Sequence, residues 1–406
     1  MKEDKKVPQL RFPEFTDAWK QRELKEVVNF SRGQGLPWAD VDDLNGQFEC
    51  ILYGNLYTDY GTIIQNIKHK TNTDLKVKSK GNEVLIPGSD TTPTGLARAL
   101  FLEKENVILG GDINILSVKH DDGPFLAYEL NKLKKELIIR IKGTTVKHLQ
   151  NNDLKDIVVS LPSLEEQRKI SSLFSRLDNT ITLQQRKLNS LQKLKKGLLQ
   201  KMFPKNGENI PEIRFPEFSD AWKQRKVGDL LVERREMVTE DNEYPLMAFI
   251  ANEGVAPKGD RFDRSALVKN ADSKKYKRTK YGDFIYSSNN LESGSIGLNK
   301  YGKASISPVY SIFYPTNLAD SDFIGRYFLR KDFIGQMIRW RQGVVYGQWK
   351  IPEADFLNID IYIPSKDEQE KIGQILDKVD NTITLQQRKL ESLQKLKKGL
   401  LQQMFI

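Results

Sequence analysis

An internal repeat constrains this chain more than any other feature. The 26 residues from 178 to 203, DNTITLQQRKLNSLQKLKKGLLQKMF, return as residues 380 to 405 with only two differences. A shorter block, RFPEFTDAWKQR at 11–22, returns as RFPEFSDAWKQR at 214–225 with one difference. Because each block recurs once and about 200 residues further on, the repeats indicate two duplicated halves rather than a solenoid of short units.

Between the repeated blocks the two halves differ in sequence but keep the same outline. EVLIPG near Val84 corresponds to DFIYSS near Phe284, and DIVVSLP before Ser163 corresponds to NIDIYIP before Ser365. Short β-branched and aromatic runs predict strands, whereas longer runs that mix charged and apolar residues predict helices. We therefore expect a mixed α/β (α+β) fold with a pseudo-two-fold internal duplication. The predicted parts are two α/β globules, at 1–161 and 205–363, and two long helices, at 162–204 and 364–406.

The two long helices carry a heptad pattern. Apolar residues recur in alternating steps of four and three, as in a coiled coil, and Gln184 and Lys195 interrupt the first seam as their equivalents interrupt the second. At about 1.5 Å per residue, forty residues span roughly 60 Å. Ser163 and Glu166 have the spacing of a capping box at the helix start. The predicted seam consists of Ile170, Phe174, Leu177, Ile181, Leu188, Leu191 and Leu198 in the first helix and of Ile372, Leu376, Val379, Ile383, Leu390, Leu393 and Leu400 in the second.

A seam this long favours pairing between the two helices. It is longer than the surface of one small globule, so we expect an antiparallel coiled coil with one globule at each end. The alternative is that each helix packs only on its own globule. The segment KLKKGLL also suits a helix on a membrane surface, but its Gln-rich opposite face favours the helix pair.

Composition narrows the classes of function. The net charge of +10 favours a polyanionic partner such as nucleic acid, although a basic protein without such a partner has the same composition. Cys50 is the only cysteine, and His69, His120 and His148 lack the spacing of metal ligands, so we expect no disulfide and no metal site. The start of the chain lacks a signal-peptide core, and no run approaches the roughly 18 apolar residues of a membrane span. A cytoplasmic protein is therefore expected.

The sequence contains none of the common catalytic motifs. GxxxxGK[ST], a Gly-rich dinucleotide-binding turn, HExxH and GxSxG are all absent. We therefore expect no catalytic residue and no cofactor in this chain. Two other hypotheses stay open: a methyltransferase or nuclease fused to a coiled coil, and a structural coiled-coil protein that binds no nucleic acid.

Three motifs together suggest a family. RFPEF-x-DAW-x-QR opens each half, P-x-x-x-EQ-x-KI begins each long helix, and DNTI-x-LQQRKL-x-x-LQKLKKGLLQ-x-MF follows within it. With this layout the chain closely resembles the specificity subunits of type I restriction-modification systems, especially those of Gram-positive bacteria. The resemblance covers essentially the whole chain, and the helix motifs are its most specific part.

The resemblance implies a function and a set of partners. Each globule would be a target-recognition domain for one half of a bipartite, asymmetric site in double-stranded DNA. The paired helices would set the spacing and dock two modification subunits, which are adenine methyltransferases. Restriction subunits, which are ATP-dependent translocases and nucleases, would add to these. S-adenosylmethionine, ATP and magnesium would then belong to the partner subunits.

Several polar segments are candidates for DNA contact. Base edges are read by Arg, Lys, Asn, Gln, Ser and Thr on projecting loops, and phosphates are held by Lys and Arg. For each segment a solvated polar surface is the alternative, and we expect Trp340 and Trp349 to anchor the core. The candidate residues are Arg32, Gln34, Ser89, Thr91, Thr92 and Arg98 in the first globule and Lys274, Lys275, Lys277, Arg278, Ser288, Asn289, Asn290, Arg339, Arg341, Gln348 and Lys350 in the second.

Overall fold

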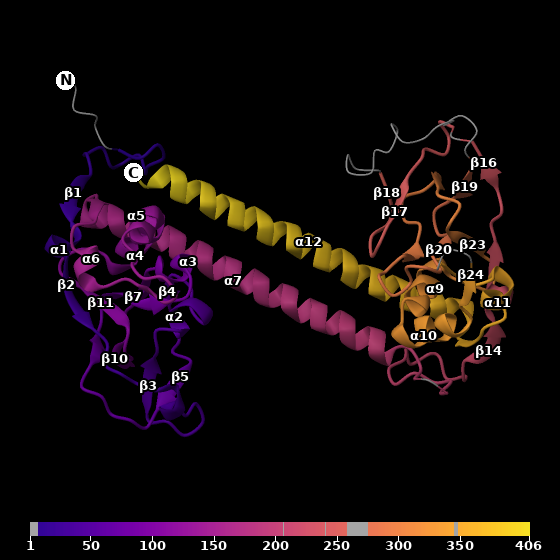
Figure 1. Cartoon of the computed structure of the whole chain (residues 1–406), viewed down its shortest axis with the longest axis horizontal. Helices are drawn as coiled ribbons and strands as arrows, with labels where there is room; N and C mark the ends of the chain where they lie inside the picture. Colours follow the sequence, from indigo (N-terminus) through magenta and orange to yellow (C-terminus); the bar gives the residue numbers. More distant parts are fainter. Residues whose placement is uncertain (1–6, 206, 240, 258–274, 345–347) are drawn as a thin grey trace. The chain divides into compact units, whose positions relative to one another are not determined.

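The chain divides into two compact units. The computed structural model describes residues 7–205, 207–239, 241–257, 275–344 and 348–406. The first unit comprises residues 1–186 and 387–406, and the second comprises residues 187–386 (Figure 1). The division therefore runs through both long helices, α7 (Leu164–Lys201) and α12 (Lys366–Met404). Each unit holds one α/β globule, part of one helix and part of the other.

The first globule is built around a five-stranded sheet with the order β2-β11-β7-β9-β4. Neighbouring strands are antiparallel except β4 and β9. A second sheet, ordered β5-β3-β10-β6, shares an apolar cluster with it. The strands are β2 (Val28–Arg32), β3 (Phe48–Ile51), β4 (Ile63–Ile64), β5 (His69–Thr71), β6 (Lys78–Lys80), β7 (Glu83–Pro87), β9 (Leu100–Leu102), β10 (Glu105–Leu109) and β11 (Ile113–Val118).

The central strand β7 is buried along its whole length because both faces of its sheet are covered. Leu85 belongs to the cluster shared by the two sheets, whereas Val84 and Ile86 belong to the cluster that contains Phe125 of α4 and Phe174 of α7. Successive strand residues point to opposite faces, so a continuously buried run needs a layer on each side. The remaining elements are β1 (Lys20–Glu23), α1 (Leu24–Val27), the 3-10 helix η1 (Trp38–Asp40), α2 (Asn55–Thr58), β8 (Ser89–Asp90), α3 (Pro93–Leu96), α4 (Gly123–Lys132), α5 (Lys134–Ile139), β12 (Lys147–His148), α6 (Asn151–Leu154) and β13 (Val158–Leu161).

The second globule repeats this plan, which confirms the predicted mixed α/β duplication. Its sheet β15-β23-β20-β21 follows the order of β2-β11-β7-β9. Asp122 caps α4 by accepting from the Phe125 amide at 3.0 Å, and Asp320 caps α9 by accepting from the Phe323 amide at 2.9 Å. The elements are β14 (Lys223–Lys226), α8 (Val227–Leu230), β15 (Leu231–Glu233), β16 (Met237–Val238), β17 (Ala248–Ile250), β18 (Gly254–Ala256), β19 (Tyr276–Thr279), β20 (Phe284–Tyr286), β21 (Ile296–Leu298), β22 (Ala304–Ile306), β23 (Ser311–Pro315), α9 (Ser321–Phe328), α10 (Lys331–Arg339), β24 (Gln342–Val344), β25 (Gln348–Lys350), α11 (Glu353–Leu357) and β26 (Asp360–Ile363).

Each long helix starts at a buried ion pair with the repeated RFPEF block. Arg11 donates two hydrogen bonds to Glu166 at 2.6 and 2.7 Å, and Arg214 donates two to Glu368 at 2.7 Å each. Such bidentate pairs fix orientation as well as position. Ser163 Oγ accepts from the Glu166 amide at 3.4 Å, as the predicted capping box requires. The carboxylate of Glu166, however, is engaged by Arg11, because a buried carboxylate gains more from a charged partner than from one backbone amide.

The last residues of each helix complete the globule of the other half. In the first unit Phe405 lies edge-on to Trp19, with 6.3 Å between ring centroids. In the second unit Phe203 lies edge-on to Trp222, also with 6.3 Å between centroids. Both pairs are buried within the main apolar cluster of their unit. The repeated Met-Phe ending is thus a core element of each globule and not only the end of a helix.

Within the first unit the two helix segments run antiparallel. Phe405 packs on Phe174, with 5.6 Å between ring centroids, and Lys397 Nζ lies 2.5 Å from Asp178 Oδ1. As the residue number increases along α7, from Phe174 to Asp178, the number of the contacting residue near or in α12 decreases, from Phe405 to Lys397. The C-terminus accordingly lies beside the start of α7 (Figure 1).

Burial along both helices follows the predicted seam. Every predicted seam residue is buried or half-buried, whereas Leu183 and Leu194, which lie off the seam, are 62% and 50% exposed. Lys195, which interrupts the apolar pattern, lies 2.7 Å from Asp380 in the second unit, as its equivalent pairs with an aspartate in the first. The predicted antiparallel coiled-coil packing of α7 and α12 is confirmed.

Candidate nucleic-acid interface

In the first globule two predicted segments meet at Asp112, a residue that the sequence analysis did not single out. Arg32 NH2 donates to Asp112 Oδ1 at 2.9 Å, and Ser89 Oγ donates to Asp112 Oδ2 at 2.9 Å. Asp112 has a φ of 56°, in the left-handed region that residues other than glycine seldom adopt. Asp112 follows two glycines between β10 and β11, and this Gly-Gly-Asp sequence is the feature from which a turn at Asp112 could have been predicted. Asp112 holds the end of β2 next to the loop that follows β7.

The threonines after β8 are oriented by a second carboxylate. Thr91 and Thr92 donate through their hydroxyls to Asp90 at 3.3 and 3.0 Å. Thr92 also caps α3 by accepting from the Gly95 amide at 3.3 Å. Both threonine side chains remain exposed. Exposed hydroxyls with a fixed direction are suitable partners for base edges and phosphates.

Arg98 and Gln34 have roles inside the first globule. Arg98 donates to the carbonyl oxygens of Tyr57 at 3.1 Å and Tyr60 at 2.8 Å. Burial lowers the pKa of the Arg98 guanidinium from its ordinary value. Gln34 Oε1 accepts from the Lys76 amide at 3.1 Å. The structure therefore uses Arg98 to position the segment after α2, rather than presenting its guanidinium to an outside partner.

Trp38, in η1 of the first globule, is 61% exposed. Its ring packs edge-on against His69, with 5.3 Å between centroids. His69 Nδ1 lies 3.0 Å from Asp43 Oδ1, and His69 Nε2 lies 3.2 Å from Asp59 Oδ2. Because each ring nitrogen faces a carboxylate, His69 supports the tryptophan and is not placed as a metal ligand or a general base.

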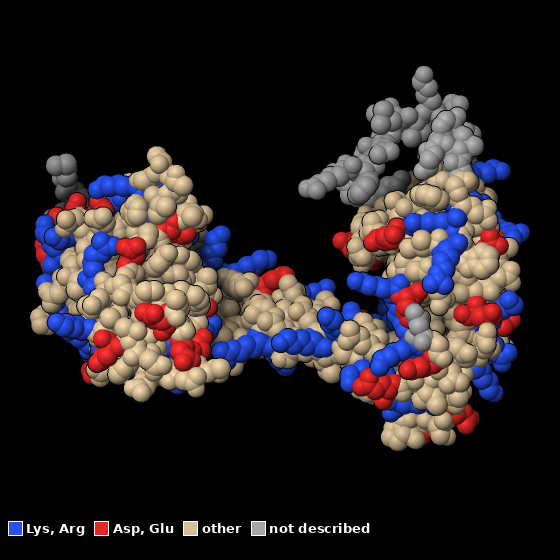
Figure 2. All heavy atoms as spheres, turned by 60° about the horizontal axis from the view of Figure 1, so that its bottom comes forward, with Lys and Arg blue, Asp and Glu red and all other residues tan. Residues whose placement is uncertain are grey.

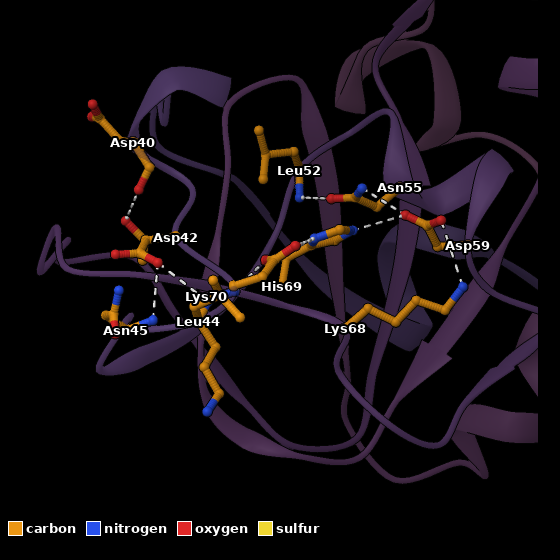
Figure 3. Close-up of polar contacts among 12 residues, drawn as sticks. Asp40, Asp42, Leu44, Asn45, Leu52, Asn55, Asp59, Lys68, His69 and Lys70 are labelled. Atoms are coloured by element: carbon orange, nitrogen blue, oxygen red, sulfur yellow. Dashed lines mark hydrogen bonds and ion pairs between the residues drawn. The ribbon is translucent and has the colours of Figure 1, made fainter.

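Asp59 is the centre of a polar cluster that includes His69 (Figure 3). Besides His69, Asn55 Nδ2 donates to it at 2.7 Å and Lys68 Nζ lies 3.6 Å away. Burial alone would raise the pKa of Asp59, but the hydrogen bonds with His69 and Asn55 outweigh it and hold the pKa below its ordinary value. Through Asp59, the cluster ties His69 of β5 to Asn55 of α2. Asn55 Oδ1 also accepts from the amide of Leu52, which follows β3, at 2.8 Å.

In the second globule two distant candidate segments are joined by hydrogen bonds from backbone amides to side-chain oxygens. Asn289 Oδ1 accepts from the Trp349 amide at 2.6 Å, and Ser288 Oγ accepts from the Ile351 amide at 3.0 Å. Ser288 is nearly buried, whereas Asn289 and Asn290 are exposed. The loop after β20 and strand β25 therefore form one continuous surface.

The expectation that Trp340 and Trp349 anchor the core was wrong. They are 44% and 49% exposed. Trp340 directly follows α10, and Trp349 lies in β25, an exposed strand that pairs only with β24, in a two-stranded ribbon, among the described strands. The nearby core is instead filled by aromatic residues of α10 and α11, such as Phe333 and Phe356. The sequence could not decide this, because tryptophans that alternate with Arg and Gln are compatible both with side chains buried in the core and with an exposed ribbon.

The cations around this ribbon differ in how they are used. Arg341 NH1 donates to Glu292 Oε2 at 2.9 Å, and only 11% of its side chain is exposed. Arg339 and Gln348 are exposed, and the Lys350 side chain is 57% exposed, with its ammonium 3.7 Å from Glu353. Arg339 and Lys350 are therefore the cations of this segment that best suit contact with phosphate.

The basic run before β20 is largely engaged within the globule. Lys277 Nζ donates to the Tyr310 carbonyl at 2.9 Å, and Arg278 NH2 donates to Asp241 Oδ2 at 2.7 Å. Lys275 is exposed, and Lys274 lies outside the described residues. Among the described cations of this run, Lys275 and Lys280 are exposed.

Charge on the visible face is mixed rather than concentrated. Figure 2 shows Lys and Arg side chains spread along the long helices and over the second globule, with Asp and Glu between them. Within the described ranges, no group of three or more His, Cys, Asp or Glu residues is placed to hold a metal ion. Among the helices of the same ranges, none combines the length and the low polarity that crossing a membrane requires.

Comparisons with known proteins agree with this two-part architecture. A family model described as type I restriction modification DNA specificity domain matches residues 16–193 and again residues 219–395. The type I restriction enzyme MjaVIII specificity subunit of Methanocaldococcus jannaschii is 22% identical over 98% of this chain and 93% of its own length. The putative MjaX specificity subunit of the same organism is 22% identical over 96% of this chain and 93% of its own length. The crystal structure of a type I restriction-modification S subunit from M. genitalium shares the fold, with a TM-score of 0.63 at 15% identity, over 98% of this chain and 99% of that one.

Proposed function

The chain belongs to the family of type I restriction-modification DNA specificity domains, and we propose that each of its globules reads one half of a bipartite, asymmetric site in double-stranded DNA. The observation that carries this proposal is the double family match, because each match spans one globule and most of one helix. The two globules differ in sequence where the helices are nearly identical, so two different half-sites are expected.

The exposed side chains of each globule support DNA contact. Thr91 and Thr92 in the first globule, and Asn289 and Asn290 in the second, supply the hydroxyl and amide groups that suit base edges. In the second globule Arg339, Lys275 and Lys350 supply exposed cations that suit phosphates. In the second globule the exposed Trp349 lies next to Asn289, because its backbone amide donates to Asn289 Oδ1.

The helices suit a second role, docking the modification subunits while setting the distance between the two half-sites. Leu183 and Leu396 of the first unit are 62% and 51% exposed, and Leu194 and Leu385 of the second are 50% and 63% exposed. At 3.6 residues per turn, Leu183 lies roughly 200° around α7 from the seam residue Ile181, so it faces away from the partner helix. Repeated exposed leucines opposite a buried seam are typical of a surface that binds another protein.

In this proposal the chain supplies recognition and assembly, and its partners supply the chemistry. Two modification subunits would bind S-adenosylmethionine and methylate adenine. Restriction subunits would bind ATP and magnesium. The whole complex would act on DNA in the cytoplasm.

Methylation by the purified complex tests the proposal. The chain is mixed with its modification subunits, labelled S-adenosylmethionine and a plasmid library, and modified adenines are mapped by sequencing. We expect one bipartite, asymmetric motif. Exchanging residues 22–161 for another family member's first globule should change one half of the motif and leave the other intact. Methyl transfer by this chain without partners would instead favour an enzyme, and a change in both halves would contradict separate readers.

A further inference from the structure

Arg32 and Asp112 form an ion pair that contributes little to the stability of the first globule. The two side chains are 43% and 48% exposed, with Arg32 Nη2 2.9 Å from Asp112 Oδ1. Ion pairs this exposed stabilise a fold only slightly, because water competes for both partners. Asp112 nevertheless has a φ of 56°, a conformation that few residues other than glycine adopt. Stability alone therefore does not account for the arrangement.

The contacts around Asp112 fix the direction of the Arg32 guanidinium. Asp112 Oδ2 accepts from Ser89 Oγ at 2.9 Å, so the carboxylate cannot turn away from Arg32 without losing this hydrogen bond. The Gly88 amide donates to the carbonyl oxygen of Asp112 at 2.6 Å, which holds the backbone in place as well. A Cβ on Gly88 would lie 3.2 Å from Arg32 Nη2, so the glycine leaves the space that the guanidinium needs.

A second set of hydrogen bonds holds the segments that carry these residues. Strand β8 pairs with β12, and the Leu149 amide, just after β12, donates to the Gly88 carbonyl oxygen at 3.0 Å. Asn114 lies opposite Arg32 in the ladder between β2 and β11. It is fully buried, and its Nδ2 donates to the Leu149 carbonyl oxygen at 2.8 Å. Arg32 therefore lies on a rigid frame, as a side chain that recognises a ligand by its direction requires.

The guanidinium keeps donors that suit a guanine base. It carries several N–H groups in a planar fork, and the carboxylate of Asp112 accepts from one of them. Such a fork matches the O6 and N7 acceptors that guanine presents in the major groove. A phosphate suits this arginine less well, because the adjacent carboxylate offsets the positive charge on which phosphate contact depends.

We infer that Arg32 reads a guanine of the first half-site in the major groove and that Asp112 is the positioning residue that orients it. The inference rests on the proposed function, in which the first globule reads one half-site. It gives Arg32 a different role from the exposed Lys275 and Lys350 of the second globule. Those lysines supply charge, whereas Arg32 supplies a fixed direction.

Conservative substitutions test the two roles separately. Arg32→Lys keeps the positive charge but loses the planar fork. Asp112→Gly removes the carboxylate and keeps a residue for which a positive φ is not strained, whereas Asp112→Asn retains one oxygen acceptor. The matched control Arg140→Lys makes the same change in an arginine that bonds to Glu136 of α5.

Base preference at every position of the target is the readout. Each full-length variant is assembled with the modification subunits, and modified adenines are mapped on the plasmid library. The exchange of residues 22–161 identifies which half-site belongs to the first globule. We expect Arg32→Lys to lower the preference for one G·C pair of that half-site by about tenfold. Asp112→Gly should lower it at the same position, and Asp112→Asn should lower it less. The other half-site and the control should not change.

Three results would overturn the inference. An unchanged motif in Arg32→Lys would mean a solvated side chain, and equally weaker methylation of every sequence would mean a phosphate contact. Loss of the guanine preference in Arg32→Lys but not in Asp112→Gly would remove the positioning role of Asp112. A bipartite motif without a G·C pair in the first half-site would also contradict the inference while leaving the proposed function intact. If the unaltered complex yields no bipartite motif, the proposed function fails together with this inference.

Discussion

Phe405 stacks on Phe125, with 5.2 Å between the ring centroids and 23° between the ring planes. Phe405 directly follows the second long helix, α12, and Phe125 lies in α4 of the first globule. Phe203 takes the equivalent place against Phe323 in α9, with 5.4 Å between centroids. Each globule therefore depends on residues from the far end of the opposite helix for part of its core.

Removing either ring should destabilise its own unit. Phe405→Ala leaves a cavity among buried aromatic residues, and such changes cost about 3–5 kcal/mol of unfolding free energy. Phe203→Ala should have a similar effect on the second unit. Denaturant unfolding, followed with a probe in each unit, measures both. The control Leu396→Ala removes a 51% exposed side chain and should cost about 0.5 kcal/mol or less. Equal effects from the control and Phe405→Ala would mean that the ring adds no core stability.

A fragment of residues 1–203 should form a two-fold symmetric dimer. Its own Met-Phe ending matches the sequence that fills the Trp19 and Phe125 site in the full chain, so a second copy can supply it. Light scattering should give twice the monomer mass, and Phe203→Ala in the fragment should reduce dimerisation. With modification subunits the fragment should select a palindrome of the first half-site. A fragment that remains monomeric in the assembled complex would argue against this exchange.

Glu129 should make the first globule less stable as pH rises. Its side chain is buried, its Oε1 accepts from the Ser160 amide at 3.0 Å, and its Oε2 has no hydrogen-bond partner among the described residues. Burial raises the pKa of Glu129 to about 7 from the ordinary 4.5. The folded state therefore binds the proton more tightly, so this contribution is complete below pH 4.5 and is lost as the pH rises through 7.

The expected loss from Glu129 is about 3 kcal/mol between pH 4.5 and pH 8. Glu129→Gln keeps an oxygen acceptor without the charge, so it should weaken this pH dependence and raise stability at pH 8 relative to the unaltered chain. Urea unfolding of the variant and of the unaltered chain, each at pH 5 and at pH 8, gives the four unfolding free energies that the comparison needs. The same difference between the two pH values in variant and parent would show that Glu129 is already ionised in the folded protein at pH 5.

Lengthening both helices where the units divide should lengthen the gap between half-sites. Four residues inserted after Arg186 and four after Gln386 leave the contacts within each unit unchanged. Four residues add about 6 Å at 1.5 Å per residue and keep the seam nearly in phase. At about 3.4 Å per base pair, the non-specific spacer should grow by one or two base pairs while both half-sites stay the same. Active methylation at the original spacing would mean that partner subunits, not the helices, position the globules.

Exposed amides and cations in the second globule should affect DNA differently. Asn290→Ala should relax preference at particular base pairs by about 1–3 kcal/mol, because a lost base contact affects only the base it reads. Lys275→Gln with Lys350→Gln should weaken binding to every duplex and reduce the log-log salt slope by about one unit for each lost phosphate contact. Titrations at several salt concentrations against specific and random duplexes separate the two. A salt slope unchanged by the lysine variant would mark those lysines as solvated.

Local patterns in the sequence were enough to predict the elements and their duplication. The four-and-three spacing of the seam specifies which face of each helix is buried, because helical periodicity is a property of neighbouring residues. The strand runs and the repeated blocks likewise predict two similar α/β globules. Sequence motifs and composition also led to the family that the comparisons support.

Only the tertiary structure decided which distant residues meet. It placed the Met-Phe ending of one half in the core of the other, joined Arg32 to Ser89 through Asp112, and turned Arg98 inward to carbonyl oxygens. It also left Trp340 and Trp349 exposed. None of these outcomes follows from local spacing, because burial and pairing depend on what the rest of the chain packs against each residue.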